Sequence, residues 1–171
     1  MTRRATQTRA RSRIATLAAV AVVAAAWVAL LLNGAALGWL QRLFAVATSA
    51  VLRLFGCATV VDGTSVVSGQ FSISVVTACT GLFATGLYVV AVLLFPAAWR
   101  SRLVGCAVGV CVLFVVNVVR LVSLYYVGVH WPYALDVVHQ VVWQSLLIAT
   151  VVAMWLLWAG RARRPGPRSA S

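Results

Sequence analysis

The sequence predicts an all-α, polytopic membrane protein with about four transmembrane helices, one interfacial amphipathic helix and a short extracytoplasmic β-like hairpin. Of its 171 residues, 63% are hydrophobic and 9% are charged, whereas roughly a quarter of a typical globular protein is charged. A chain of this length cannot bury that much apolar surface in one aqueous core, so lipid must solvate it. Uncharged runs long enough to cross a hydrocarbon core of about 30 Å recur between arginines.

Four apolar runs are the predicted membrane spans. The first follows five arginines, and at nineteen residues it is long for the apolar part of a signal peptide, so we interpret it as a retained anchor. A single membrane domain at 14–160 is thus expected between basic tails at 1–13 and 161–171. The spans are expected at about 14–32, 82–99, 103–127 and 139–160.

Two segments between the first and second spans have a different character. Residues 35–55 place Arg42 and Arg53 on one helix face, because eleven residues are close to three turns. This pattern predicts an amphipathic helix in the membrane interface, and a further span is the alternative. Residues 57–76 contain Asp-Gly and Ser-Gly turn signals and a run of alternating polarity, which predict a β-like hairpin outside the membrane.

The arginine distribution predicts the orientation of the chain in a plasma membrane. All fourteen basic residues are arginines, and nine of them lie in the two tails. Arg100 and Arg102 lie between the second and third spans. Because basic loops stay in the cytoplasm, both termini are expected there, and 57–76 is expected outside. Topology therefore accounts for the net charge of +12, and membrane lipids rather than nucleic acid are the expected partners.

This topology brings three reactive side chains to one depth of the membrane. Cys79 precedes the second span, and His139 opens the fourth. Arg120 lies seventeen residues into the third span, which is about 26 Å along a helix, so all three are expected at the outer mouth. A thiol attacks a carbonyl, an imidazole exchanges protons and a guanidinium stabilises an oxyanion, so we predict a nucleophilic acyl-transfer site. No cofactor is expected, and no ligand spacing suggests a metal.

Neighbouring residues supply possible support for this site. An arginine at this depth needs a partner or a water-filled cavity, although snorkelling of Arg120 to the headgroups is the alternative. Asn117 and Ser123 share its helix face. Thr80 and Gly81 follow the cysteine, where a small turn would let the backbone approach a substrate.

The histidine has an acidic neighbour, Asp136, three residues before His139. Asp136 would hold the imidazole tautomer, as the acid does in a Ser-His-Asp triad; a helix N-cap is the favoured alternative. We interpret His130 as an interfacial residue. Three further cysteines are interpreted as small buried hydrophobes: Cys57, Cys106 and Cys111.

The ordered motifs resemble the exosortase/archaeosortase family of membrane-embedded cysteine transpeptidases and proteases. The resemblance rests on Ala78-Cys79-Thr80-Gly81, Asn117-Val118-Val119-Arg120 and His139, in this order and at matching membrane depth. It covers roughly residues 40–157 and includes the Asp-Gly hairpin. Two positions depart from the family pattern, because Thr77 stands where many members have glutamate and Trp143 where many have glycine. With few predicted spans, the chain resembles a compact member.

The resemblance implies an enzyme that cleaves the C-terminal sorting signals of secreted proteins through a thioester acyl-enzyme on the extracytoplasmic side. Its substrates would carry a short C-terminal motif, a transmembrane helix and a basic tail. Cys79, Arg120 and His139 would be catalytic. A non-catalytic membrane scaffold or assembly factor is one alternative function. A small transporter subunit, with Arg120 as an anion site, is another.

The predicted orientation is testable with reporter fusions. A reporter enzyme that is active only outside the cytoplasm should be inactive when it is fused at Ser171, because the arginine-rich tail stays inside. The same reporter fused after Gly69, within the predicted hairpin, should be active. An active fusion at Ser171 would refute this topology.

Overall fold

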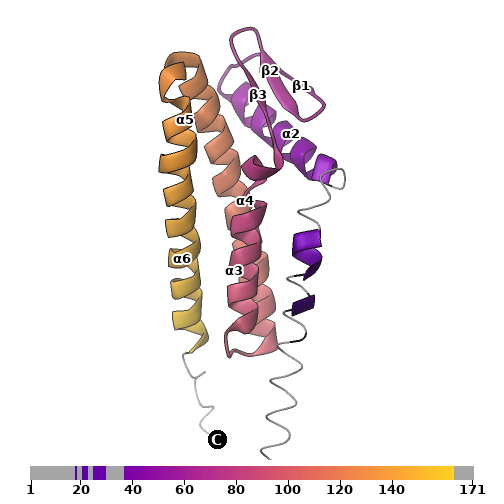
Figure 1. Ribbon diagram of the computed structural model, residues 1–171, viewed down its shortest axis with the longest axis vertical. Coiled ribbons are helices and arrows are strands. Elements are labelled where there is room, and N and C mark those ends of the chain that lie inside the picture. The colour runs from indigo at the N-terminus through magenta and orange to yellow at the C-terminus, as the bar shows by residue number, and fades with distance from the viewer. Residues whose placement is uncertain (1–17, 19–20, 23–24, 30–36, 164–171) are drawn as a thin grey trace, which may run out of the picture.

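The computed structural model describes residues 18, 21–22, 25–29 and 37–163 (Figure 1). The predicted tail at 1–13 lies outside the described residues. So do most of the predicted anchor at 14–32 and residues 164–171 of the second tail.

Three helices form the body of the molecule. Helix α3 (Leu82–Leu94), helix α4 (Trp99–His130) and helix α6 (Trp143–Ala162) pack against one another and run along the long axis (Figure 1). By length and composition, Trp99–His130 and Pro132–Ala162 are long and apolar enough to cross a membrane. Helix α3 has 13 residues and rises about 20 Å, less than the hydrocarbon thickness of about 30 Å.

Proline explains where the structure departs from the expected helix boundaries. Helix α3 ends at Leu94, ahead of the expected 99, because Pro96 holds Phe95 in an extended conformation (φ −72°, ψ 136°). Helix α4 then begins at Trp99 and continues to His130, so Arg100 and Arg102 belong to its first turn. Pro132 follows its end.

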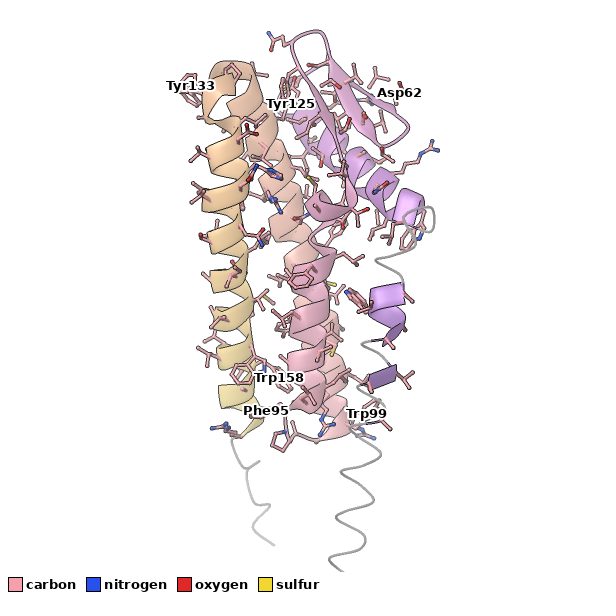
Figure 2. All side chains as sticks on the ribbon, in the orientation of Figure 1. Asp62, Phe95, Trp99, Tyr125, Tyr133 and Trp158 are labelled. Atoms are coloured by element: carbon pink, nitrogen blue, oxygen red, sulfur yellow. The ribbon has the colours of Figure 1, made fainter. Side chains whose placement is uncertain are left out.

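Aromatic side chains lie at both ends of the helical body. Figure 2 shows Tyr133 at one end and Phe95, Trp99 and Trp158 at the other. Phe95 packs edge-on against the Trp158 ring at 5.4 Å between centroids. Rings with an apolar body and a polar atom favour the two membrane–water interfaces, so this distribution fits a membrane-spanning body.

Helix α2 (Gly38–Leu54) lies in the range where an interfacial helix is expected. Its buried face packs against α4 and the strands, while Trp39, Leu43 and Leu54 are exposed. Ser49 is buried and shares a 2.9 Å hydrogen bond with the Thr59 hydroxyl. Placement of α2 in the interface stays a prediction, because it depends on the bilayer around this apolar face.

The short hairpin predicted at 57–76 is instead a three-stranded antiparallel sheet. Its strands are β1 (Thr59–Asp62), β2 (Ser65–Ser68) and β3 (Ser72–Ser74), in the order β1-β2-β3. The segment contains two turns rather than one. The first has Gly63 at φ 58°, and the second is held by Ser68 Oγ, which accepts hydrogen bonds from the N–H groups of Gln70 and Phe71. The alternating run after Ser68 therefore forms a third strand.

The inner face of the sheet joins the main core. Val66 is fully buried, and Ile73 packs beside it. Tyr125, near the end of α4, donates a 2.7 Å hydrogen bond to Ser68 Oγ (Figure 2). This core also contains Cys79, so the sheet, α2 and α4 together position the cysteine.

A second core holds α3 against α4 through a glycine contact. Tyr88 is 2% exposed and donates a 3.2 Å hydrogen bond to the carbonyl of Gly105. A Cβ added at Gly109 would overlap the Tyr88 ring. Small residues thus let the two helices approach closely, as is common between membrane helices.

This contact predicts the effect of adding one methyl group. Gly109→Ala should lower the free energy of unfolding in detergent micelles by about 1–3 kcal/mol, the usual cost of overpacking. Gly160→Ala is the matched helical control, because nothing lies within 4 Å of its added Cβ, and it should keep or slightly raise stability. Equal stability of Gly109→Ala and the parent would contradict the close approach of α3 and α4.

Candidate active site

A short turn carries the cysteine between the sheet and α3. The chain leaves β3, stays extended through Val76 (φ −88°, ψ 165°) and forms one 3₁₀ turn at Thr77–Thr80. We call this segment the Cys79 turn. Thr80 Oγ1 closes it with a 2.7 Å hydrogen bond to the carbonyl of Thr77. Gly81 then adopts φ 65° before α3 begins, a conformation that glycine adopts without strain.

Asn117 fastens this turn to α4. Its side chain is 1% exposed, and its Nδ2 donates a hydrogen bond to the carbonyl oxygen of Cys79. A Cβ at Gly81 would lie 3.0 Å from Asn117 Oδ1. Both the conformation and the space at this position therefore favour glycine. Three predicted supporting residues thus shape or bind the backbone around Cys79: Thr80, Gly81 and Asn117.

His139 faces the thiol from the far side of the site. Its Nε2 lies 3.5 Å from Cys79 Sγ, within hydrogen-bonding range for sulfur. His139 belongs to a π-helical turn, Val138–Val142, between the short helix α5 (Leu135–Val137) and α6. Such turns are rare and occur frequently at functional sites. This local widening of the helix positions the imidazole.

Arg120 is buried beside this pair. It is 4% exposed, which argues against snorkelling to the headgroups. It is close enough to Cys79 and His139 for the charges to interact. Within the described part of the chain, its Nε has no hydrogen-bond partner and no carboxylate pairs with it. A buried guanidinium in this state offers an N–H donor to an incoming oxygen.

A cavity of about 450 Å³ opens beside the site, between α3 and α6. Its polar end is formed by Arg120, Gln144 and the Cys79 turn, and its walls are apolar side chains of both helices. This volume lies in the range of ligand pockets. The apolar wall residues are Phe83, Ala84, Leu87, Leu147, Ile148, Val151 and Val152.

Asp136 has neither of the contacts expected from the sequence. It lies close enough to His139 for their charges to interact, but among the described residues it forms no hydrogen bond with the imidazole. It does not cap a helix either, because Ala134 is the residue before α5. His130 bonds the Tyr126 carbonyl at 3.0 Å through Nδ1, on the exposed surface.

The remaining cysteines differ from their expected burial. Cys111 is exposed, so its interpretation as a buried hydrophobe is wrong. Cys57 and Cys106 are half-buried, and Cys57 Sγ lies 3.6 Å from the hydroxyl of Tyr126. Cys79 is the buried one among the four.

Gln144 is not among the residues predicted from the sequence, yet it reaches the polar end of the cavity from α6. One signal was available, since Gln144 is a polar residue five positions after His139 on a largely apolar helix. Its amide both donates and accepts hydrogen bonds, so Gln144 adds a neutral polar group to the end of the cavity that Arg120 also lines.

Comparison with protein families gives an independent result. The family model described as transmembrane exosortase (Exosortase_EpsH) matches residues 3–159, which include Cys79, Arg120 and His139. Curated proteins and solved structures give no match. The match extends over most of the chain and confirms the resemblance seen in the sequence, and the chain therefore belongs to the transmembrane exosortase family.

Proposed function

We propose that this protein is a membrane-embedded cysteine protease or transpeptidase that cleaves the C-terminal sorting signals of secreted proteins outside the cytoplasm. Family membership implies a transmembrane sorting enzyme that acts on such signals. The proposed cysteine chemistry rests on one observation, the distance of 3.5 Å between His139 Nε2 and Cys79 Sγ. A thiol within reach of an imidazole is the arrangement of a nucleophile with its base.

The first step forms an acyl-enzyme. His139 Nε2 takes the proton of the Cys79 thiol, and Sγ attacks the carbonyl carbon of the scissile peptide bond. The carbonyl oxygen gains negative charge in the tetrahedral intermediate. His139 then gives its proton to the leaving amine as the C–N bond breaks, which leaves a thioester on Cys79.

The second step releases the acyl group. Water or an amine attacks the thioester carbon while His139 removes a proton from it. The C–S bond then breaks, and the proton returns to Sγ. Water completes hydrolysis, and an amine completes transpeptidation. Asp136, near enough to interact with His139 by charge, would stabilise the imidazolium in both steps.

Arg120 would stabilise the oxyanion. A buried cation without an anionic partner is costly, and an oxygen that gains charge during the reaction supplies the missing partner. Arg120 lines the cavity next to the Cys79 turn, and its buried Nε has no hydrogen-bond partner within the described residues. Stabilisation that appears only in the transition state accelerates the reaction rather than tightening binding.

Removal of the thiol tests the nucleophile. Cys79→Ala should abolish cleavage of a co-expressed secreted protein that carries a C-terminal sorting signal. Cleavage is measured as the change in the size of this substrate on an immunoblot. The protein should still insert, because the change deletes one sulfur atom. Cys111→Ala is the control, since this thiol is exposed on α4, and it should cleave like the parent. Parental cleavage by Cys79→Ala would end the acyl-enzyme proposal.

A charge-conserving substitution tests Arg120. Lysine keeps the positive charge but presents a point charge instead of a planar fork of donors. Arg120→Lys should therefore cut the cleavage rate by about 10²–10³, the usual effect of losing one oxyanion donor. Arg100→Lys, on the exposed first turn of α4, should cleave at the parental rate. If both variants match the parent, Arg120 supplies only charge.

The role of Asn117 is testable through stability. Asn117→Leu removes the donor to the Cys79 carbonyl and should lower the free energy of unfolding by about 1–3 kcal/mol, because a buried acceptor is left unpaired. Cleavage should also fall, since the Cys79 turn loses its tie to α4. Ser123→Ala removes a 2.8 Å bond that stays within α4, and its effect should be within about 0.5 kcal/mol. Parental stability and cleavage by Asn117→Leu would show that the turn is held by other contacts.

A further inference from the structure

The sheet above the site has one unpaired edge at β3. The order of the strands is β1-β2-β3, so β3 pairs on one side only. Val75 N–H donates to the carbonyl of Thr64, and Ser68 N–H donates to that of Phe71, both at 3.0 Å. Because bonded residues alternate in an antiparallel ladder, the N–H and C=O groups of Ser72 and Ser74 point away from β2.

The other edge of the sheet is occupied. The same alternation turns the backbone of Thr59 in β1 outward. Its carbonyl accepts a 2.8 Å hydrogen bond from Arg53 Nε and a second bond from Nη2. Proteins commonly protect edge strands against unwanted pairing. Here an arginine bonds the Thr59 carbonyl and α2 packs against β1, whereas within the described residues no group bonds the outer edge of β3.

The unpaired edge leads directly to the cysteine. Ser72, Ser74, Val76 and Ala78 are all exposed, and the chain remains extended through Val76. Cys79 is five residues beyond Ser74, a distance of at most about 18 Å along the chain. A chain lying along β3 would therefore reach the thiol.

The opposite side of the site is also sparsely packed. The segment from Pro132 to Val142, which includes His139, contains no buried side chain. In Figure 1, β3 is drawn on the side of the sheet toward α5. In this view, the outer edge of β3 and the short helix that precedes the π-helical turn of His139 lie on the same side of the sheet.

We propose that the free edge of β3 binds the segment of the protein substrate that carries the scissile bond, as an added fourth strand. The inference rests on the proposed function, because it takes Cys79 as the nucleophile. The outward N–H and C=O groups of β3 lie two residues apart. An extended polypeptide presents N–H and C=O groups with the same two-residue repeat, so it can form backbone hydrogen bonds along this edge. Recognition then comes largely from the substrate main chain, and alternate side chains add specificity.

Proline substitution on the edge tests the added strand. Ser74→Pro removes the outward N–H, and β2 does not use this group, so an edge strand tolerates the change. Cleavage of a co-expressed secreted protein with a C-terminal sorting signal should fall about tenfold or more, because a main-chain hydrogen bond is lost and the ring obstructs the edge. Ser65→Ala, on the neighbouring strand β2, removes the same hydroxyl bond between Ser65 and Ser74, keeps the Ser74 N–H and should cleave like the parent. The rate at which a small methanethiosulfonate reagent modifies Cys79 should be the same in all three proteins.

Disulfide trapping provides a second measurement that does not depend on turnover. Ser72→Cys is placed in a chain whose four native cysteines are alanine, and single cysteines are moved along the substrate segment before the cleavage site. An added strand should cross-link at alternate substrate positions, since successive side chains point to opposite faces. Cross-linking at every position, or at none while the substrate still co-purifies, would overturn the proposal.

The two proposals fail in different ways. Parental cleavage by Cys79→Ala would remove the proposed function. Parental cleavage by Ser74→Pro, with Cys79→Ala inactive, would leave that function standing and overturn the added strand. If Ser74→Pro also slows modification of Cys79, the change has disturbed the Cys79 turn, and the cross-linking pattern decides.

Discussion

The hydrogen bond from Asn117 to the carbonyl of Cys79 ties the turn between the sheet and α3 to helix α4. A backbone turn at membrane depth is stable only where its polar groups find partners inside the protein. Asn117 supplies one partner, and Thr80 supplies another by bonding the Thr77 carbonyl. Arg120 follows Asn117 by three residues, so one face of α4 holds the cysteine backbone and presents the guanidinium.

Helix α4 organises the remaining contacts along its length. Near its start, its glycines receive Tyr88 of α3, and near its end Tyr125 bonds Ser68 in the sheet. The proposed catalytic groups lie between these two anchors. Because Cys79 and His139 come from segments on either side of α4, the Cys79–His139 distance depends on how firmly α3 and α6 pack against this one helix.

Much of this arrangement follows from local sequence patterns. Apolar runs predict the long helices, and motif order with membrane depth predicts that Cys79, Arg120 and His139 meet. The π-helical turn at His139 could not be predicted, because it depends on how α6 packs rather than on residue type. The contact of Arg53 with Thr59 was also missed. Helical periodicity assigns Arg53 to the polar face of a helix, but it does not show that a strand carbonyl lies within reach of the side chain. The third strand was missed because its alternating run was assigned to a single hairpin.

The shortness of α3 has a consequence for the bilayer. With 13 residues, it falls short of the hydrocarbon thickness by about 10 Å. Such hydrophobic mismatch is relieved when lipids thin locally around the short segment or when polar groups extend toward the surface. In a bilayer spanned by α3, the shortfall would include the Cys79 turn and would draw headgroups and water toward the thiol. A substrate peptide bond next to a membrane-anchored segment would then be hydrated at the same depth as the Cys79 thiol.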